Sequence, residues 1–213
     1  MIEYFYSIRS SFTYLGAAAV TDLAARHSLR LRHVVIDLAA LVASYGETVA
    51  QRAYAGARAF ESHPARAAYT QLEYQRWSRR RGIPIDPDPS NHYGARELPS
   101  GVVIACQRQG LAATDAVSHA LLQALWRDDR DTADPAVVTA ILQELDLDLD
   151  GAALGETAMT PEIQAELKAN TEEAKARGVF GAPTYIFQDE IFFGQDRLDF
   201  LEEAILAAKS DAR

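Results

Sequence analysis

The first third of the chain changes from a strand-like to a helix-like hydrophobic pattern and back again. Residues 2–6 (IEYFY) are aromatic and β-branched, as in a buried strand. From about Phe12 the apolar side chains recur at helical spacing, and Ser10 and Ser11 are candidate N-caps. Residues 29–38 (LRLRHVVIDL) alternate and then become apolar, which is typical of a half-buried strand entering a core. The pattern predicts the order β-α-β.

A long segment of helical character follows, rich in Ala, Leu, Gln, Glu and Arg. Its periodicity predicts helices over residues 65–81, 101–109, 113–126, 135–145 and 161–177. The last of these has a clear N-terminal signature, because Thr160 offers a hydroxyl cap, Pro161 has no N–H to satisfy and Glu162 faces the positive end of the helix dipole. Gly178 marks its end.

The end of the chain returns to a strand-like pattern. Residues 182–194 (APTYIFQDEIFFG) predict a β-hairpin, and residues 196–209 predict a helix with one apolar face. The tail is therefore β-β-α. We infer an α/β fold in which residues 1–42 and 178–213 form a thioredoxin-like domain and residues 43–177 form a large, all-helical insertion domain.

Composition narrows the class of protein. With 48% apolar and 24% charged residues the chain is an ordinary globular protein, and its net charge of −9 argues against nucleic acid as a partner. We interpret the one basic run, residues 79–81, as a solvated helix end. No apolar run reaches the length of a membrane span and the first residues do not resemble a signal peptide, so we expect a cytoplasmic protein without a membrane partner.

The cysteine and histidine content restricts the chemistry. Cys106 is the one cysteine, so an internal disulfide and dithiol redox chemistry are excluded, and we expect this thiol in the core. The histidines lack metal-ligand spacing, and we predict no metal site. Residues 146–151 match only the first half of a calcium loop, and we interpret them as an acidic turn before a helix.

Two short segments carry candidate chemistry. Ser10 stands where a strand gives way to a helix, and free N–H groups at such a helix start favour negative charge. Residues 179–185 (VFGAPTY) place Pro183 at the entry to a strand; in thioredoxin-like proteins this proline is cis, and the residue before it, here Ala182, pairs its backbone with a thiol-containing peptide. The alternatives are a plain helix cap at Ser10 and a plain trans-proline loop.

Four stretches together resemble a known family. They are residues 5–15 (FYSIRSSFTYL), 73–85 (EYQRWSRRRGIPI), 179–185 and 192–205 (FFGQDRLDFLEEAI). The chain resembles the 2-hydroxychromene-2-carboxylate isomerases, which are glutathione-dependent enzymes related to kappa-class glutathione transferases and to periplasmic dithiol oxidases. The resemblance extends over nearly the whole chain, and it implies a homodimer.

The resemblance implies a glutathione site formed by Ser10, Arg66, Ala182, Pro183, Gln195 and Asp196. Ser10, which is also the implied catalytic residue, would hydrogen-bond the glutathione sulfur, and Ala182 would pair with the cysteine backbone. Gln195 and Asp196 would hold the γ-glutamyl end, and Arg66 would lie near the glycyl end. For Asp196 a second interpretation is an N-cap of the last helix, and the two are compatible.

The chain also departs from the family pattern. The segment Ser7-Ile8-Arg9-Ser10-Ser11 is one residue shorter than the family's Asp-x-x-Ser-Pro loop and lacks its proline. Glu47 stands where many members have an asparagine that contacts glutathione. Arg9 is unusual in this loop. It would either offer a cation to the thiolate or to a carboxylate, or be a solvated surface charge.

The implied reaction is cis-trans isomerisation of a conjugated aromatic keto acid by reversible addition of a glutathione thiolate. The carboxylate of this small aromatic substrate would need donors, and the loop at residues 90–96 (SNHYGAR) offers Asn91, Tyr93 and Arg96; the alternative is an ordinary solvated loop. Two other functions share the same residues: kappa-like conjugation of glutathione to electrophiles, and a non-catalytic thioredoxin-fold binding module.

Overall fold

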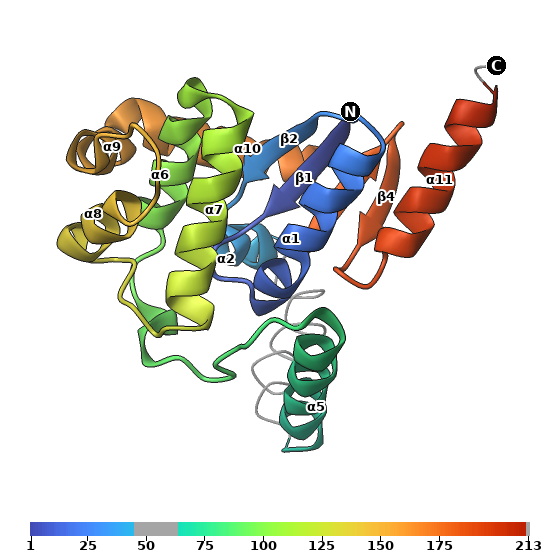
Figure 1. Cartoon of the computed structure of the whole chain (residues 1–213), viewed down its shortest axis with the longest axis horizontal. Helices are drawn as coiled ribbons and strands as arrows, with labels where there is room; N and C mark the ends of the chain where they lie inside the picture. Colours follow the sequence, from blue (N-terminus) through green and yellow to red (C-terminus); the bar gives the residue numbers. More distant parts are fainter. Residues whose placement is uncertain (45–63, 212–213) are drawn as a thin grey trace.

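The computed structural model describes residues 1–44 and 64–211, and its centre is a four-stranded mixed sheet of order β2-β1-β3-β4 (Figure 1). β1 (Ile2–Tyr6) and β2 (Leu31–Val35) are parallel. β3 (Thr184–Phe187) is antiparallel to β1 and forms a hairpin with β4 (Glu190–Phe193). The predicted β-α-β start and β-β-α end are confirmed, and the two ends of the chain build one sheet.

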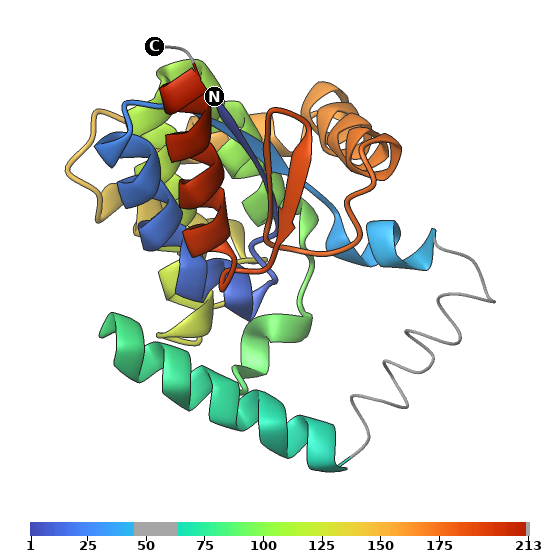
Figure 2. The ribbon, with the colours of Figure 1, turned by 90° about the vertical axis from the view of Figure 1, so that its right-hand side faces the viewer.

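Helices surround this sheet, and one, α5, lies along the base of the molecule in both views (Figures 1 and 2). The helices are α1 (Ser11–Arg26), α2 (Leu38–Ala43), α5 (Pro64–Arg81), α6 (Glu97–Cys106), α7 (Leu111–Trp126), α8 (Pro135–Gln143), α9 (Gly151–Ala158), α10 (Pro161–Ala176) and α11 (Leu198–Asp211), with 3-10 turns η2 (Ser90–Tyr93) and η3 (Gln107–Gln109). None of the helices described combines the length and apolar character needed to cross a membrane.

The two faces of the sheet carry different cores, as the alternation along β1 requires. Tyr4 and Tyr6 point into a large core shared with α1, α6, α7 and α11, whereas Phe5 points into a smaller one. The smaller core is closed by α2 and α10, which contribute Leu41 and Ala174. Cys106 is completely buried in the larger core, as predicted. Both cores combine residues from the ends and from the middle of the chain, while the domain boundaries stay a prediction.

Two helices differ from the sequence prediction, one because of a proline and the other because of glycines. α6 begins at Glu97, four residues before the predicted start, because Pro99 lies in the first turn, where its missing N–H is not needed. α9 was not among the predicted helices, since Gly151 and Gly155 lower its helical propensity. The acidic turn is confirmed: Asp150 caps α9 by accepting from the Ala153 N–H at 3.0 Å.

Arg81, at the end of α5, is not the solvated charge that we predicted. Its guanidinium donates to the carbonyl oxygens of Leu15 and Gln195, the second at 2.8 Å, and lies 4.9 Å from the centre of the Trp77 ring. Burial lowers its pKa. Arg79 and Arg80 are exposed, as predicted for a solvated helix end. Arg81 instead joins α5 to α1 and to the turn before α11.

A contact between α6 and α9 gives a test of this packing. A Cβ at Gly101 would lie 2.4 Å from the Ala158 carbonyl oxygen, whereas a Cβ at Gly155 would meet nothing within 4 Å. We expect Gly101→Ala to destabilise the protein by about 1–3 kcal/mol through overpacking. Gly155→Ala should be neutral or stabilise it by up to about 1 kcal/mol. Urea unfolding followed by circular dichroism measures both, and equal effects would contradict the close approach.

Candidate functional site

Ser10 lies at the junction that the sequence singled out. β1 ends at Tyr6, a short loop follows, and Ser10 caps α1 in an extended conformation (φ −102°, ψ 115°). Its Oγ accepts from the Thr13 N–H at 3.1 Å and donates to the Ala182 carbonyl oxygen at 3.0 Å, across 172 residues of chain. Ser10 is therefore a helix cap, as the alternative interpretation held, and it also touches the segment before Pro183.

The Ala182–Pro183 peptide bond is cis, so the plain trans-proline interpretation is wrong. Hydrogen bonds hold this loop on both sides: the Thr184 hydroxyl donates to the Gly181 carbonyl at 2.8 Å, and the Gly194 N–H donates to the Pro183 carbonyl at 2.9 Å. The loop is thus fixed against the hairpin, and its Ala182 carbonyl faces the start of α1.

Gln195 and Asp196 follow the hairpin but face different surroundings. Gln195 is only 2% exposed, and its Oε1 has no hydrogen-bond partner among the described residues. The Asp196 carboxylate is 42% exposed and lies 3.4 Å from the Arg197 guanidinium. Gly194 has a φ of 106°, and a Cβ there would lie 2.4 Å from an Asp196 carboxylate oxygen. Glycine therefore lets this carboxylate fold back over the turn.

The proposed N-cap role of Asp196 is wrong. α11 begins at Leu198, and the Leu201 N–H donates to the Arg197 carbonyl at 3.1 Å, so Arg197 occupies the cap position. The carboxylate of Asp196 is left at the surface, one residue before the cap, where it is accessible to a ligand.

Arg9 is half-buried and holds two loops together. Its guanidinium donates to the carbonyl oxygens of Asn91 at 2.7 Å, His92 and Ala95. The His92 ring returns a hydrogen bond to the Arg9 carbonyl at 3.2 Å. Burial lowers the pKa of Arg9, and the interpretation as a solvated surface charge is wrong. Because its two terminal nitrogens donate to backbone carbonyls of the neighbouring loop, Arg9 stabilises the loop that delivers Ser10.

The three candidate substrate residues are engaged elsewhere or point outward. The Asn91 amide donates to the Asp129 carbonyl at 2.6 Å, and the Arg96 guanidinium lies 3.5 Å from the Asp37 carboxylate. Tyr93 is 83% exposed. Arg9 holds the loop at residues 90–96 beside the Ser10 loop. The Asn91 side chain is hydrogen-bonded to Asp129 and stabilises its own loop.

Tyr74 is a site neighbour that sequence reasoning missed. Its hydroxyl lies 2.9 Å from the Ser11 Oγ, and its ring is 5.6 Å from that of Phe12. Tyr74, Trp77 and Arg81 recur at helical spacing along α5, and this spacing within residues 73–85 was the available signal. α5 therefore reaches the first turn of α1, directly beside Ser10.

A buried polar chain supports the strand that carries this loop. The Tyr6 hydroxyl lies 2.8 Å from His33 Nδ1, and His33 Nε2 lies 2.7 Å from an Asp115 carboxylate oxygen. The ring of Tyr6 stacks on that of Tyr4 with 4.2 Å between centres. Burial raises the pKa of Tyr6, so its phenol stays protonated. These contacts fix β1 between its neighbour β2 and α7.

Two residues from the sequence analysis have no described side chain. Arg66 lies in the first turn of α5, and its side chain is outside the described set; Glu47 lies outside the described residues altogether. Their expected roles toward glutathione stay predictions. The described part of the site therefore consists of Ser10, Ala182–Pro183 and the turn at Asp196.

The Arg9 contacts predict a specific loss of stability. Arg9→Lys keeps the charge but replaces a planar fork of donors by a single ammonium group, so we expect about 1–2 kcal/mol of destabilisation, or a Tm lower by roughly 2–8 °C. Arg108→Lys is the matched control, because the pair of Arg108 with Glu162 is exposed. Thermal unfolding followed by circular dichroism compares them. A Tm for Arg9→Lys within error of the control would contradict the anchoring role.

Comparison with curated proteins supports the resemblance described above. The chain is 27% identical over 205 residues to the 2-hydroxychromene-2-carboxylate isomerase of Sphingobium xenophagum, covering 96% of this chain and 97% of the relative. It is 25% identical over 205 residues to the enzyme of the same name from Pseudomonas putida, covering 96% and 94%.

Solved structures agree on the fold. A structure of 2-hydroxychromene-2-carboxylate isomerase superimposes with a TM-score of 0.77 at 24% identity, covering 99% of this chain and 97% of the other. The cytosolic disulfide reductase DsbM from Pseudomonas aeruginosa with GSH gives 0.65 at 16% identity, covering 99% and 98%. The family model for the DSBA-like thioredoxin domain matches residues 1–206. The chain therefore belongs to the DSBA-like thioredoxin domain family.

Proposed function

We propose that this protein is a glutathione-dependent isomerase of the 2-hydroxychromene-2-carboxylate isomerase type, acting on a conjugated aromatic keto acid. The observation that carries the proposal is the 3.0 Å hydrogen bond between the Ser10 hydroxyl and the Ala182 carbonyl at the N-terminus of α1. It brings a hydroxyl donor, a helix N-terminus and the backbone before a cis-proline to one place. The names of the curated relatives support the same reaction.

The described residues support glutathione binding at three positions. Beside the Ala182 carbonyl, Ser10 offers a hydroxyl proton to a sulfur at the positive end of the α1 dipole. The half-exposed Asp196 carboxylate offers a charge partner to the ammonium group of the γ-glutamyl end. Between them, the fixed Ala182–Pro183 loop offers main-chain groups to a peptide backbone. These residues would hold the tripeptide in an extended form across the end of the sheet.

Held by Ser10, Ala182 and Asp196, glutathione would supply a thiolate for reversible addition to the unsaturated carbon of the substrate, which would allow rotation about a single bond. Ser10 would stabilise the charged sulfur by turning its O–H away from the Ala182 carbonyl and donating a hydrogen bond to the sulfur, with the proton staying on the Ser10 oxygen. Such a charge-assisted hydrogen bond contributes roughly 1.5–3 kcal/mol. At 1.36 kcal/mol per unit, this lowers the thiol pKa by about one to two units. The α1 dipole adds about 0.3–1 kcal/mol.

The protein's own thiol does not compete with this chemistry. Cys106 is the single cysteine of the chain and is completely buried. Burial raises its pKa to about 11, so its reactive thiolate form is scarce at neutral pH. A hydroxyl at Ser10 cannot take part in disulfide exchange, which leaves a non-redox use of an external thiol as the function that this loop supports.

Ser10→Ala tests the role of the hydroxyl. We expect the pKa of bound glutathione, measured by ultraviolet absorbance of the thiolate, to rise by about one to two units. Turnover of trans-o-hydroxybenzylidenepyruvate at neutral pH should fall by roughly ten- to hundredfold, because each unit by which the thiol pKa rises lowers the thiolate fraction about tenfold. The variant also loses a helix cap, which costs about 1 kcal/mol.

Ser10→Asp separates the two effects. Aspartate caps a helix as well as serine does, but when ionised it donates no hydrogen bond and repels a thiolate. We expect Ser10→Asp to fold normally and to be inactive. An active Ser10→Asp protein would show that Ser10 acts only as a cap, and unchanged turnover of Ser10→Ala would remove it from the mechanism.

Asp196→Asn tests the γ-glutamyl subsite. Removing the carboxylate charge should weaken glutathione binding by about five- to tenfold, as expected for a half-exposed ion pair, while the dipeptide Cys-Gly, which lacks the γ-glutamyl group, should bind both proteins equally. Asp199→Asn is the matched control, because Asp199 is an exposed carboxylate three residues away. Isothermal titration calorimetry gives the dissociation constants.

The outcomes of these titrations also distinguish the other functions. Saturable glutathione binding followed by a product that keeps a thioether would identify a conjugating enzyme. No saturable binding of glutathione at millimolar concentration would contradict the proposed function and favour a binding module. Isomerisation that requires glutathione and returns it unchanged is the expected result.

A further inference from the structure

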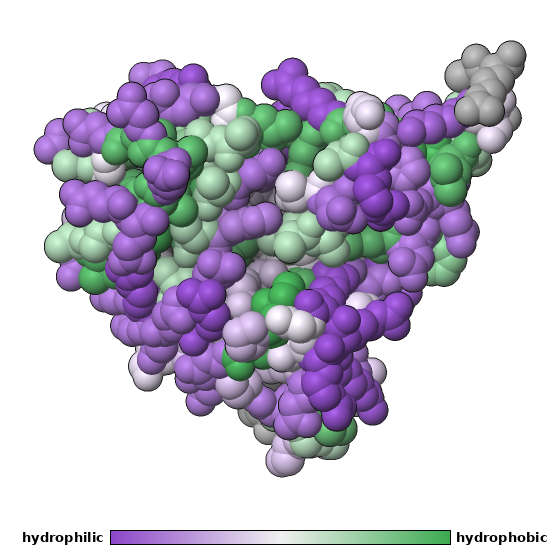
Figure 3. All heavy atoms as spheres, viewed as in Figure 1, coloured by the Kyte–Doolittle hydropathy of each residue, from purple (hydrophilic) through white to green (hydrophobic). Residues whose placement is uncertain are grey.

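The three arginines at the end of α5 face different surroundings. Mainly hydrophilic side chains cover α5 in Figure 3, and Arg79 and Arg80 are exposed. The Arg81 guanidinium is instead half-buried and lies 4.9 Å from the centre of the Trp77 ring, which packs against the larger core. Burying a cation costs free energy unless the cation is paired or hydrogen-bonded. The partners of Arg81 therefore indicate what its burial serves.

Arg81 joins the turn before α11 to α1. One terminal nitrogen of its guanidinium donates to the Leu15 carbonyl of α1, and the other donates to the Gln195 carbonyl at 2.8 Å. The Gln195 carbonyl belongs to the peptide bond that leads into Asp196, so this hydrogen bond fixes the backbone that carries the Asp196 carboxylate. Burial lowers the pKa of Arg81, and Asp199 and Asp196 are among the groups that oppose this shift. Both carboxylates therefore lie close enough to act on the cation.

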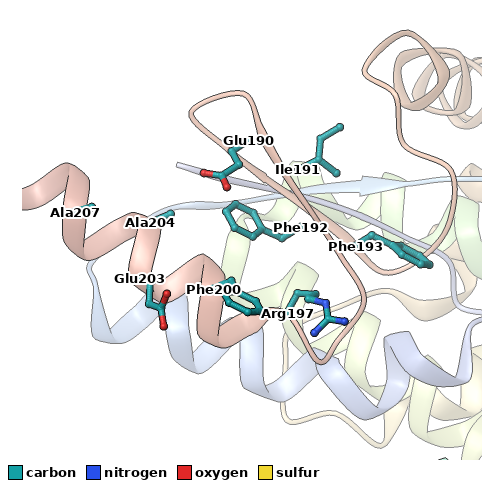
Figure 4. Close-up of a pocket in the computed structure, with 9 residues that line it drawn as sticks. All are labelled: Glu190, Ile191, Phe192, Phe193, Arg197, Phe200, Glu203, Ala204 and Ala207. Carbon is teal, nitrogen blue, oxygen red and sulfur yellow. The ribbon is translucent and has the colours of Figure 1, made fainter.

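The turn itself rests on α1. It runs from Phe193, the last residue of β4, to Arg197, just before α11, and Figure 4 shows both of these residues. The Gln195 side chain between them is 2% exposed and packs against Gly16 of α1. The Asp196 carboxylate next to it is 42% exposed. The buried residue thus attaches the turn to α1, and its neighbour presents a charge to the solvent.

At Gly16 the helix, the turn and the sheet approach too closely for a side chain. A Cβ there would lie 2.7 Å from Gln195 Cβ, 3.2 Å from the Tyr185 hydroxyl oxygen and 3.6 Å from an Arg81 guanidinium nitrogen. Tyr185 comes from β3 and Arg81 from α5, so three separate parts of the fold meet at this position of α1. A larger residue at Gly16 would push the turn away from the helix.

We propose that Arg81 is a positioning residue for the γ-glutamyl subsite, which it sets by holding the Asp196 turn on α1 over Gly16. The inference rests on the proposed function, in which Asp196 is the charge partner of the γ-glutamyl ammonium group. α1 then supports both ends of the γ-glutamyl-cysteine unit: Ser10 at its N-cap meets the sulfur, and Gly16, six residues further along, bears the turn. At 1.5 Å per residue, these two positions are about 9 Å apart along the helix. The spacing of the two subsites is therefore set by α1 and fastened by Arg81.

Arg81→Lys tests this role with ligands that contain or lack the γ-glutamyl group. Lysine keeps the charge, but its single ammonium group cannot reproduce the planar fork that bonds two carbonyls. We expect glutathione to bind roughly three- to tenfold more weakly, while Cys-Gly binds as tightly as it does to the wild-type protein. Arg79→Lys is the matched control, because Arg79 donates within α5, to the Gln75 carbonyl. Isothermal titration calorimetry measures each dissociation constant.

A double-mutant cycle shows whether Arg81 acts through Asp196. Adding Arg81→Lys to Asp196→Asn should weaken glutathione binding no further, because the carboxylate that Arg81 positions has already lost its charge. Additive losses would overturn the positioning role. An equal loss for Cys-Gly and glutathione in Arg81→Lys would overturn it too, since it would indicate general damage to the fold.

Hydrogen exchange in the protein without ligand tests the same contact independently of glutathione. The Gly194 N–H donates to the Pro183 carbonyl at 2.9 Å, and the Arg197 N–H donates to the Gly194 carbonyl at 3.1 Å. We expect both amides to exchange about threefold faster or more in Arg81→Lys, with no change in the Arg79→Lys control.

Gly16→Ala displaces the turn without touching Arg81. Alanine is the better helix former, so α1 should persist, as circular dichroism can verify, while the turn amides exchange faster and glutathione binds more weakly. Unchanged exchange in both Arg81→Lys and Gly16→Ala would overturn the proposal, even in a protein that binds glutathione. A wild-type protein that does not bind glutathione would contradict the proposed function instead, and the exchange rates would still decide whether Arg81 holds the turn.

Discussion

The hydrogen bond from the Ser10 hydroxyl to the Ala182 carbonyl is the point at which the two ends of the chain meet. It requires that β1 and β3 be neighbours in the sheet, because only then do the loop after β1 and the loop before β3 lie at one edge. The antiparallel register, with Phe5 opposite Thr184, fixes their relative height. The chemistry of the site is therefore a consequence of strand order, and any slip in register would separate the hydroxyl from the carbonyl.

Two half-buried guanidinium groups hold the rest of the molecule around that point. Arg9 joins the Ser10 loop to the η2 loop, and Arg81 joins α5 to α1 and to the turn that carries Asp196. In each case the terminal nitrogens donate to backbone carbonyls, and a planar guanidinium can bond several carbonyls at once. The carbonyls that accept from Arg9, and that of Gln195, lie in loops or short turns, whereas the Leu15 carbonyl lies within α1. Hydrogen bonds from Arg9 and Arg81 thus help to fix these loops, which lie outside the α-helices and strands.

The sequence predicted the parts of this structure that depend on local pattern. The strands follow from the aromatic and β-branched residues of β1, such as Tyr4, Phe5 and Tyr6, and from the alternation along residues 29–38. A common site for Ser10 and Ala182 was implied by the family resemblance. What it could not predict depends on distant partners. Arg9 and Arg81 look like surface charges because the carbonyls that bury them come from segments up to 114 residues away. Tyr74 was missed for the same reason, since Ser11 lies 63 residues before it.

The strand order also determines how long the first strands wait for their partners while the chain is synthesised on the ribosome. β1 and β2 are complete by residue 35, but β3, which lies between β1 and β4, begins only at Thr184. At roughly 5–20 residues per second, the apolar edge of β1 waits on the order of ten to thirty seconds for its partner. The helical layer emerges during this interval, and α7 and α10 can cover both faces of the incomplete sheet before its edge is closed. The long insertion thereby shelters a sheet that would otherwise be open to pairing with other nascent chains.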